Sequence, residues 1–303
     1  MLQTGVLAIT IPVVLIVAWK MYTKRSLVPF WVGIMVFIAF SRMLEMIPHS
    51  LFLLSSNPVS KAINGNVVLY VIYAATVAAL FEETGRYLAM RLYMKKSLTK
   101  ENSLMYGVGH GGMEAVMVVG ISYISNLMVA LMINGNDFES LFAGLDDATT
   151  AVTIDRLSAL WTLPSYQFFF AGVERISAMM LQIALSYLVY RAVKEKRMKF
   201  YGIAVGIHFA VDAATVILSG YLGSSFVGLL VLESVLLAAV ILICMKVSKL
   251  YRAEPETVQA DRRATAPVMT EREKQADPVK KNTGIAQAAN AVKRMSEETK
   301  DGE

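Results

Sequence analysis

Seven long apolar runs limit what this chain can fold into more than any other feature of its sequence. A helix needs roughly 20 apolar residues to cross the hydrocarbon core of a bilayer. The runs lie near residues 3–21, 28–54, 66–93, 103–133, 165–191, 199–221 and 224–247. The sequence therefore predicts an all-α fold, a polytopic membrane helical bundle of about seven transmembrane helices.

The composition agrees with a membrane protein. Of the 303 residues, 55% are hydrophobic and only 17% are charged. The net charge of +5 does not indicate nucleic-acid binding, because the basic residues cluster in short segments between apolar runs. Cys244 is the only cysteine, which excludes a disulfide framework and a Cys-rich zinc site. The N-terminus lacks a basic region and a small-residue cleavage site, so we expect no cleavable signal peptide.

Basic residues follow every second apolar run. They are Lys20, Lys24 and Arg25 after the first run, Arg91, Lys95, Lys96 and Lys100 after the third, Arg191, Lys194, Lys196, Arg197 and Lys199 after the fifth, and Lys246, Lys249 and Arg252 after the seventh. The alternate segments hold few basic residues, and segment 134–164 is acidic. By the positive-inside rule we expect a multi-pass protein of the plasma membrane, with its N-terminus outside and its C-terminus in the cytoplasm.

The chain divides into two parts by composition. Residues 1–250 form the predicted membrane domain, whereas residues 251–303 form a charged cytoplasmic tail that lacks core-forming residues and that we expect to be disordered. Segment 134–164 is too long for a simple connection. Within it, "SLFAGL" and "AVTIDRLSALW" predict short helices at the membrane interface.

Ionisable residues recur inside the predicted spans. Each costs about 2.5–3.5 kcal/mol near the centre of a membrane helix, so such residues persist where they face a partner or a wet cavity. They are Arg42, Glu45 and His49 in the second span, Glu82, Glu83 and Arg86 in the third, His110 and Glu114 in the fourth, Glu174 and Arg175 in the fifth, and His208 and Asp212 in the sixth. Glu174–Arg175 and Arg42–Glu45 can pair locally, and we interpret both as mainly structural.

Spacing and depth favour one shared polar site in the bundle interior. Glu82–Arg86, His110–Glu114 and His208–Asp212 are i,i+4 pairs, so the members of each pair share a helix face. Counted from the basic ends at 1.5 Å per residue, the acids and imidazoles of three spans lie roughly 10–15 Å deep. Glu82 and Glu83 differ by about 100° around the helix, so only one can point straight at a given partner.

A glutamate beside histidines can take a proton from water and so create a nucleophile. The same groups could instead bind zinc, which lowers the pKa of bound water to about 7. The zinc ligands would come from Glu82, His110, Glu114 and His208. Arg86 could keep Glu82 ionised or stabilise an oxyanion. The glycines around His110 predict either close helix packing or a widened turn through which a substrate backbone reaches the site.

Four stretches together resemble a known family. "EETGR" is similar to the EExxxR motif of the CAAX-protease and bacteriocin-processing superfamily of intramembrane proteases, and "HFAVD" resembles its HxxxN/D motif. With "GVGHGGMEA" and "GVERISAMMLQIALSYLV", the chain most resembles the YhfC branch of intramembrane metalloproteases. The resemblance covers roughly residues 28–247. The resemblance implies that the membrane domain, residues 1–250, is a protease-like domain.

The resemblance also implies roles for particular residues. Glu82 or Glu83 would activate water, His208 would bind the metal or hold the water, and Asp212 would take the place of the family's Asn or Asp. His110 and Glu114 would belong to the branch-specific motif. The chain departs from the superfamily at Gln182, which stands where a histidine is expected in the fifth span. A glutamine cannot act as a base, so either His110 substitutes for that histidine or catalysis is impaired.

Three functions compete. The first is an intramembrane endopeptidase that cleaves a membrane protein or peptide from the cytoplasmic half of the bilayer. The second is a catalytically impaired relative that binds and regulates a membrane partner, which Gln182 favours. The third is a proton-coupled carrier, although neither an internal repeat nor paired broken helices support it.

Overall fold

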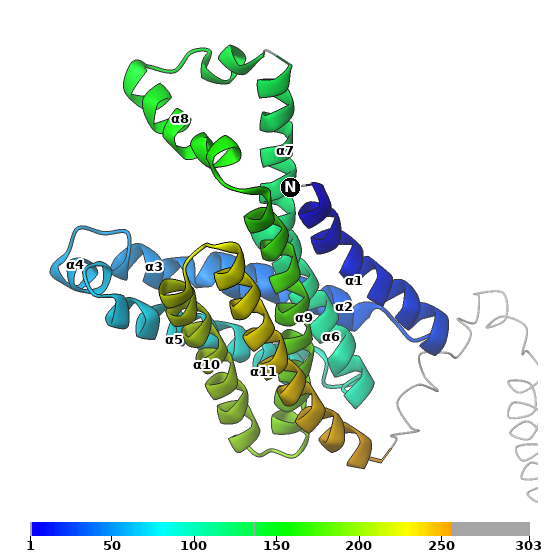
Figure 1. Cartoon of the computed structure of the whole chain (residues 1–303). Coiled ribbons are helices and arrows are strands. Elements are labelled where there is room, and N and C mark those ends of the chain that lie inside the picture. The colour runs from blue at the N-terminus through cyan, green and yellow to red at the C-terminus, as the bar shows by residue number, and fades with distance from the viewer. Residues whose placement is uncertain (1, 136, 256–303) are drawn as a thin grey trace, which may run out of the picture. The chain divides into compact units, whose positions relative to one another are not determined.

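The computed structural model describes residues 2–135 and 137–255, and every regular element in this part of the chain is a helix (Figure 1). The chain divides into two units, residues 1–260 and residues 261–303. The sequence predicts that the charged tail, residues 251–303, is disordered. Almost all of these residues lie outside the described part of the chain.

The seven predicted spans are confirmed. Each corresponds to a helix, or to a continuous series of helices, that is long and apolar enough to cross a membrane. They are α1 (Leu2–Thr23), α2–η1–α3 (Val28–Phe37, Ile38–Leu44, Met46–Phe52), α5–η2 (Val67–Leu88, Ala89–Tyr93), α6–η3–α7 (Lys100–Ala115, Val116–Gly120, Ile121–Asn134), α9 (Ser165–Lys194), α10 (Lys199–Leu222) and α11 (Phe226–Ala253).

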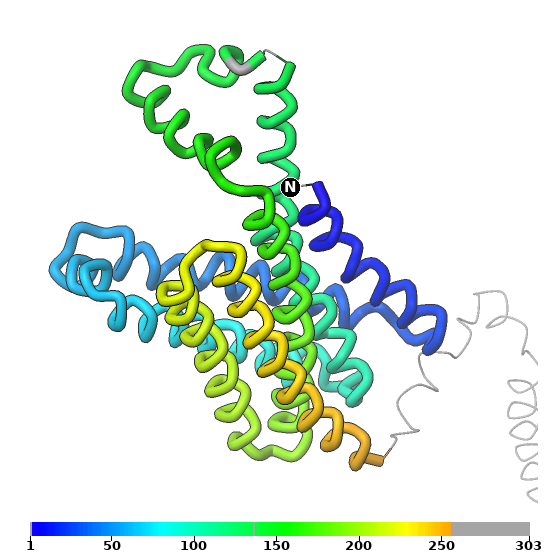
Figure 2. The backbone as a smooth tube through the Cα atoms, viewed as in Figure 1, coloured from blue at the N-terminus to red at the C-terminus, as the bar shows by residue number. Residues whose placement is uncertain are grey.

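Shorter helices connect the spans. Helix α4 (Pro58–Asn64) links α3 to α5, and Figure 2 follows this reversal of the chain. In the acidic segment, α8 (Asp147–Thr162) confirms the helix predicted over "AVTIDRLSALW", whereas "SLFAGL" overlaps only the end of the 3₁₀ turn η4 (Phe138–Phe142). Asp146 begins α8, because its side chain accepts a hydrogen bond from the backbone N–H of Thr149 at 2.7 Å.

Three of the spans contain π-helical stretches, namely η1, η2 and η3. Such stretches are rare, and they frequently occur at functional sites. Stretch η1 ends directly before Glu45, and η3 begins two residues after Glu114. The wider turns therefore lie next to two of the ionisable residues inside the spans.

The four basic segments meet at one end of the bundle, which we call the basic end. Arg25 forms an ion pair with Glu101 at 2.9 Å, which joins the segments after α1 and after η2. Lys194, at the end of α9, reaches Glu254 after α11 at 2.6 Å. At the opposite end, Gln167 of α9 donates to the carbonyl of Ser224 at 3.0 Å.

Helix α9 lies in the centre of the bundle and packs closely against α6. A Cβ atom added at Gly107 would lie 2.7 Å from Cα of Ile183, and one added at Gly109 would collide with the carbonyl oxygen of Phe30 in α2. These glycines therefore allow α6 to pack backbone to backbone, the first of the two roles that the sequence left open. This packing brings His110 next to the central helix.

Candidate active site

The carboxylate of Glu82 is the centre of a polar cluster inside the bundle. Its Oε2 atom lies 3.0 Å from Nε2 of His110 and accepts a hydrogen bond of 2.9 Å from the amide of Gln182. Glu82 comes from α5, His110 from α6 and Gln182 from α9. The three spans therefore meet at one level, and for Glu82 and His110 this agrees with the depth that counting residues from the basic ends predicts.

Glu83 has a different set of partners. Nη1 of Arg86 donates to both oxygens of Glu83, at 2.6 and 2.7 Å, and both side chains are fully buried. Arg86 thus forms its ion pair with Glu83 and not with Glu82, the i,i+4 residue with which it shares a helix face. Arg86 follows Glu83 by three positions, one fewer than the EExxxR motif requires, so the likeness to that motif is loose.

His208 of α10 joins the two glutamates. Its Nδ1 atom lies 2.9 Å from Oε1 of Glu83, and because an ionised carboxylate only accepts hydrogen bonds, Nδ1 carries the proton. The other ring nitrogen, Nε2, lies 3.9 Å from Oε2 of Glu82 and 3.5 Å from Oδ2 of Asp212. The predicted His208–Asp212 pair therefore shares a helix face, and Nε2 points between two carboxylates.

Gln182 bridges the cluster. The guanidinium of Arg86 donates to its Oε1, and its Nε2 donates to Glu82 and, at 2.8 Å, to Glu114. This fixes the orientation of the amide, because a guanidinium offers only donors and a carboxylate only acceptors. Gln182 is thus a member of the site, and a histidine at this position could not make the same three contacts in the same way.

A second ion-pair layer lies beside Glu114. Arg175 donates from Nη1 to Oε1 of Glu114 at 3.1 Å and pairs through Nη2 with Glu174. The predicted local Glu174–Arg175 pair is present. Because Arg175 also reaches Glu114, which itself contacts Gln182, this pair is connected to the main cluster.

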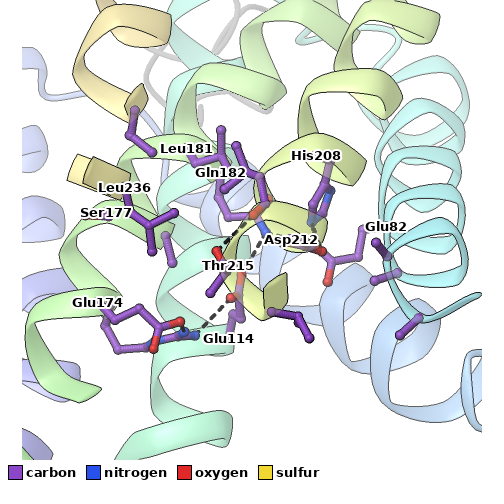
Figure 3. Close-up of a pocket in the computed structure, with 18 of the residues that line it drawn as sticks. Glu82, Glu114, Glu174, Ser177, Leu181, Gln182, His208, Asp212, Thr215 and Leu236 are labelled. Carbon is purple, nitrogen blue, oxygen red and sulfur yellow. Dashed lines mark hydrogen bonds and ion pairs between the residues drawn. The ribbon is translucent and has the colours of Figure 1, made fainter. Parts of the chain in front are cut away.

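A pocket of about 360 Å³ runs along this cluster. The predicted site residues on its wall are Glu82, Glu114, Glu174, Arg175, Gln182, His208 and Asp212, several of which Figure 3 shows facing one another. Glu83, Arg86 and His110 do not line the pocket, and each of them is fully buried. The predicted catalytic set therefore divides into a wall that can touch a ligand and a backing layer, formed by Glu83, Arg86 and His110, that lies behind the wall.

The structure adds residues that the sequence interpretation did not assign to the site. Glu45 and His49 line the pocket as well; His49 contacts Glu45 at 3.1 Å and the hydroxyl of Tyr73 at 3.1 Å. Glu45 thus pairs with His49, four residues on, whereas the sequence interpretation paired it with Arg42. Their i,i+4 spacing was the available signal.

Glu233 of α11 was missed altogether. It is 7% exposed, and its Oε2 atom has no hydrogen-bond partner. The signal that could have found it is a single acid in the apolar stretch "GLLVLESVLL". An ionisable group inside a membrane helix costs free energy, which is the argument that identified the other buried charges.

The zinc site that the sequence offered as an alternative does not fit this arrangement. Among the described residues, no three His, Cys, Asp or Glu side chains are grouped so that they could hold a metal ion. Nε2 of His110 faces Oε2 of Glu82 at 3.0 Å, so this candidate donor atom is directed at another side chain. The chemistry proposed below therefore uses the side chains alone.

The fold and the cluster define a class: a seven-span helical membrane protein with buried glutamate and histidine side chains beside an internal pocket. The chain belongs to the YhfC family, whose sequence model, described as YhfC intramembrane metalloprotease, matches residues 7–242. It is 36% identical over 214 residues to "Uncharacterized membrane protein YhfC" of Bacillus subtilis (strain 168), which covers 71% of this chain and 82% of that protein. No solved structure matches the chain.

Proposed function

We propose that the chain is an intramembrane endopeptidase of the plasma membrane that uses Glu82 to activate water. The observation that carries this proposal is the pair of atoms Glu82 Oε2 and His208 Nε2. Both residues line the pocket, and the two atoms lie 3.9 Å apart, too far for a direct hydrogen bond. One water molecule bound to both would be held between a base and an imidazole.

The reaction would proceed by general acid–base catalysis. Glu82 takes a proton from the water while its oxygen attacks the carbonyl carbon of the scissile peptide bond. Nε2–H of protonated His208 stabilises the oxyanion of the tetrahedral intermediate. Glu82 then gives its proton to the leaving nitrogen as the C–N bond breaks, which restores the carboxylate.

The backing layer would position these two residues. His110 of this layer and Gln182 of the pocket wall both contact Oε2 of Glu82, so they fix the direction of the carboxylate. Glu83, itself paired with Arg86, accepts the hydrogen bond of Nδ1–H of His208 and so fixes the orientation of the ring. This is the arrangement by which a buried carboxylate orients a catalytic imidazole.

The substrate would be a membrane protein or peptide. In an α-helix each carbonyl is hydrogen-bonded and shielded by side chains, so the scissile stretch must unwind before water can attack it. The pocket lies at the small end of the range for ligand sites, about 300–1,000 Å³. It is thus suited to a short extended stretch of chain. The family description supports the proteolytic chemistry.

The test is cleavage of single-span membrane peptides by the purified protein in detergent. We expect Glu82→Gln to lower kcat at least 10³-fold and leave the melting temperature unchanged, since amide and carboxylate are nearly the same size. Glu101→Gln is the matched control, because Glu101 pairs with Arg25 at the basic end, away from the pocket. Equal cleavage by wild type and the Glu82 variant would refute the proposal.

A second candidate is a non-catalytic relative that binds a membrane partner. Gln182 supports it, because its amide donates to Oε2 of Glu82 and so occupies one of the positions at which that oxygen could bind water. A photo-crosslinked peptide that is bound by wild type and Glu82→Gln alike, and never cut, would favour this function over proteolysis.

A further inference from the structure

The residues that line the pocket indicate toward which end of the bundle it opens. The sequence interpretation placed cleavage in the cytoplasmic half of the bilayer. We propose that the pocket opens toward the end of the bundle opposite the basic loops, and that the substrate is a short unwound stretch of a membrane peptide presented from that side. The side from which a substrate arrives rests on the proposed function, whereas the direction of the opening does not.

The first argument comes from two antiparallel helices. Helix α5 runs toward the basic end, and its pocket-lining residues Tyr70, Ala74 and Ala78 all precede Glu82. Helix α10 runs away from the basic end, and its lining residues Thr215 and Val216 follow His208. Although the two helices run in opposite directions, both line the pocket on the side of the cluster away from the basic loops.

The other walls agree. On α9, which runs toward the basic end, the lining residues Glu174 and Ala178 precede Gln182. On the span formed by α2, η1 and α3, which leaves the basic end, the lining begins at Glu45 and continues to Leu53 beyond the end of α3. Four spans therefore place the pocket in the same half of the bundle.

Exposure increases along the pocket in the same direction. At the cluster, Glu82 is 7% exposed, and Gln182 and His208 are each 3% exposed. At the far end of the lining, Tyr70 and Val216 are each 39% exposed. The cluster is thus the closed end of the pocket, and Tyr70 and Val216 mark its mouth.

The basic half of the bundle is closed by the main hydrophobic core. Met90, Tyr106, Leu185, Tyr190 and Ala204 belong to that core, and each is 0% exposed. On its own helix, each lies nearer the basic end than the site residue of the cluster does. Protein interiors are packed as densely as organic crystals, so a peptide could not pass through this layer without local unfolding.

The consequence concerns the topology of the substrate. If the basic end faces the cytoplasm, as the positive-inside rule predicts, the pocket faces the opposite leaflet. The scissile bond then lies in the outer half of the substrate's membrane segment, whereas the sequence interpretation placed cleavage in the cytoplasmic half.

Cysteine accessibility tests the direction of the opening without any substrate. In a Cys244→Ser background, Ala74→Cys and Thr215→Cys report on the pocket, and Ala204→Cys reports on the core at the basic end. Lys95→Cys and Leu145→Cys mark the two ends of the bundle. A membrane-impermeant quaternary-ammonium methanethiosulfonate is added to intact protoplasts and to inverted vesicles.

We expect both pocket cysteines to react from the same side as Leu145→Cys, at least ten-fold faster than Ala204→Cys. Reaction from the side of Lys95→Cys, or no reaction of either pocket cysteine from any side, would overturn the proposal. The labelling pattern should be the same in Glu82→Gln, which does not cleave. A protein that labels as expected but cuts no peptide would refute the proposed function and leave the opening established.

Discussion

Glu82 and Glu83 are adjacent in the sequence, and they face opposite sides of the same imidazole. Oε1 of Glu83 lies 2.9 Å from Nδ1 of His208, whereas Oε2 of Glu82 lies 3.9 Å from its Nε2. Only Glu82 lines the pocket. One carboxylate therefore orients the ring, and the other shares with it the space in which a water would react.

This division predicts different effects for the two glutamates. In Glu83→Gln the buried charge of Arg86 loses its partner, and removing one member of a buried ion pair costs about 3–5 kcal/mol. We expect a large decrease in melting temperature as well as in cleavage, measured by thermal unfolding in detergent. Glu82→Gln, which changes kcat alone, is the comparison. A Glu83 variant as stable as wild type would contradict the backing role.

Gln182 offers a test of the bridge between helices. Gln182→Glu would replace an amide that donates to Glu82 and Glu114 with a third carboxylate, so two hydrogen bonds become repulsive contacts. We expect a loss of at least 2 kcal/mol, on the order of two unsatisfied buried groups, and loss of cleavage. Gln167→Glu is the matched control, because Gln167 lies at the far end of α9 on the carbonyl of Ser224. Equal effects of the two substitutions would contradict the bridging role.

The arrangement of donors predicts that cleavage does not require a metal. No three metal-ligating side chains are grouped among the described residues, and Glu82 and His208 suffice for the proposed acid–base steps. We expect undiminished cleavage in EDTA and less than about 0.1 zinc per chain by mass spectrometry of the purified protein. Cleavage that EDTA abolishes and zinc restores would show that the cluster rearranges around a metal.

Much of the fold follows from the sequence because it depends on local quantities. The length and apolarity of each run determine a span, and counting residues from the basic ends places Glu82, His110 and His208 at one depth. These predictions need only helix rise and composition. The resemblance to the superfamily also marks Gln182 in the fifth span, where a histidine is expected.

The remainder depends on the rotation of each helix about its axis, which the sequence does not encode locally. Glu82 and Glu83 lie in the same apolar stretch of sequence, so the sequence does not distinguish them. Which of the two pairs with Arg86 is decided only when α9 and α10 pack against α5. Glu45 looks like a local partner of Arg42 in the sequence, and only the packed spans place it with His49 on the pocket wall. The direction of the opening likewise follows from where the core packs, not from the depth of the charges.

The packing of α6 predicts that a single methyl group is costly at Gly109. In Gly109→Ala the new Cβ would collide with the carbonyl oxygen of Phe30, a backbone atom that moves only with its helix. We expect a loss of about 1–3 kcal/mol, typical of overpacking, and reduced cleavage, because His110 is the next residue. Gly206→Ala is the matched control, since an added Cβ there would meet nothing within 4 Å. A stable, active Gly109→Ala protein would contradict this close packing.

The basic end contains a group whose titration should be visible in stability. The carboxylate of Glu254 accepts hydrogen bonds from Lys194 at 2.6 Å, Tyr190 at 2.6 Å and Tyr187 at 2.9 Å. Burial alone would raise the pKa of Glu254, but these hydrogen bonds outweigh it and hold the pKa below its ordinary value of 4.5. The charged form is therefore favoured by folding.

The sign of the pH dependence follows from this lowered pKa. The unfolded chain takes up the proton at a higher pH than the folded chain, so the contribution of Glu254 is complete above its ordinary pKa and is lost as the pH falls through the folded value. We expect Glu254→Gln to lower stability by about 1–2 kcal/mol at pH 7 and the difference from wild type to shrink below about pH 4.5. Thermal unfolding at a series of pH values measures this difference.

The control is Glu195→Gln, which removes the half-exposed pair with Arg191 and should cost no more than about 0.5 kcal/mol of stability. A difference for Glu254→Gln that stays constant, or grows, as the pH falls would mean that its carboxylate is not held in the charged form.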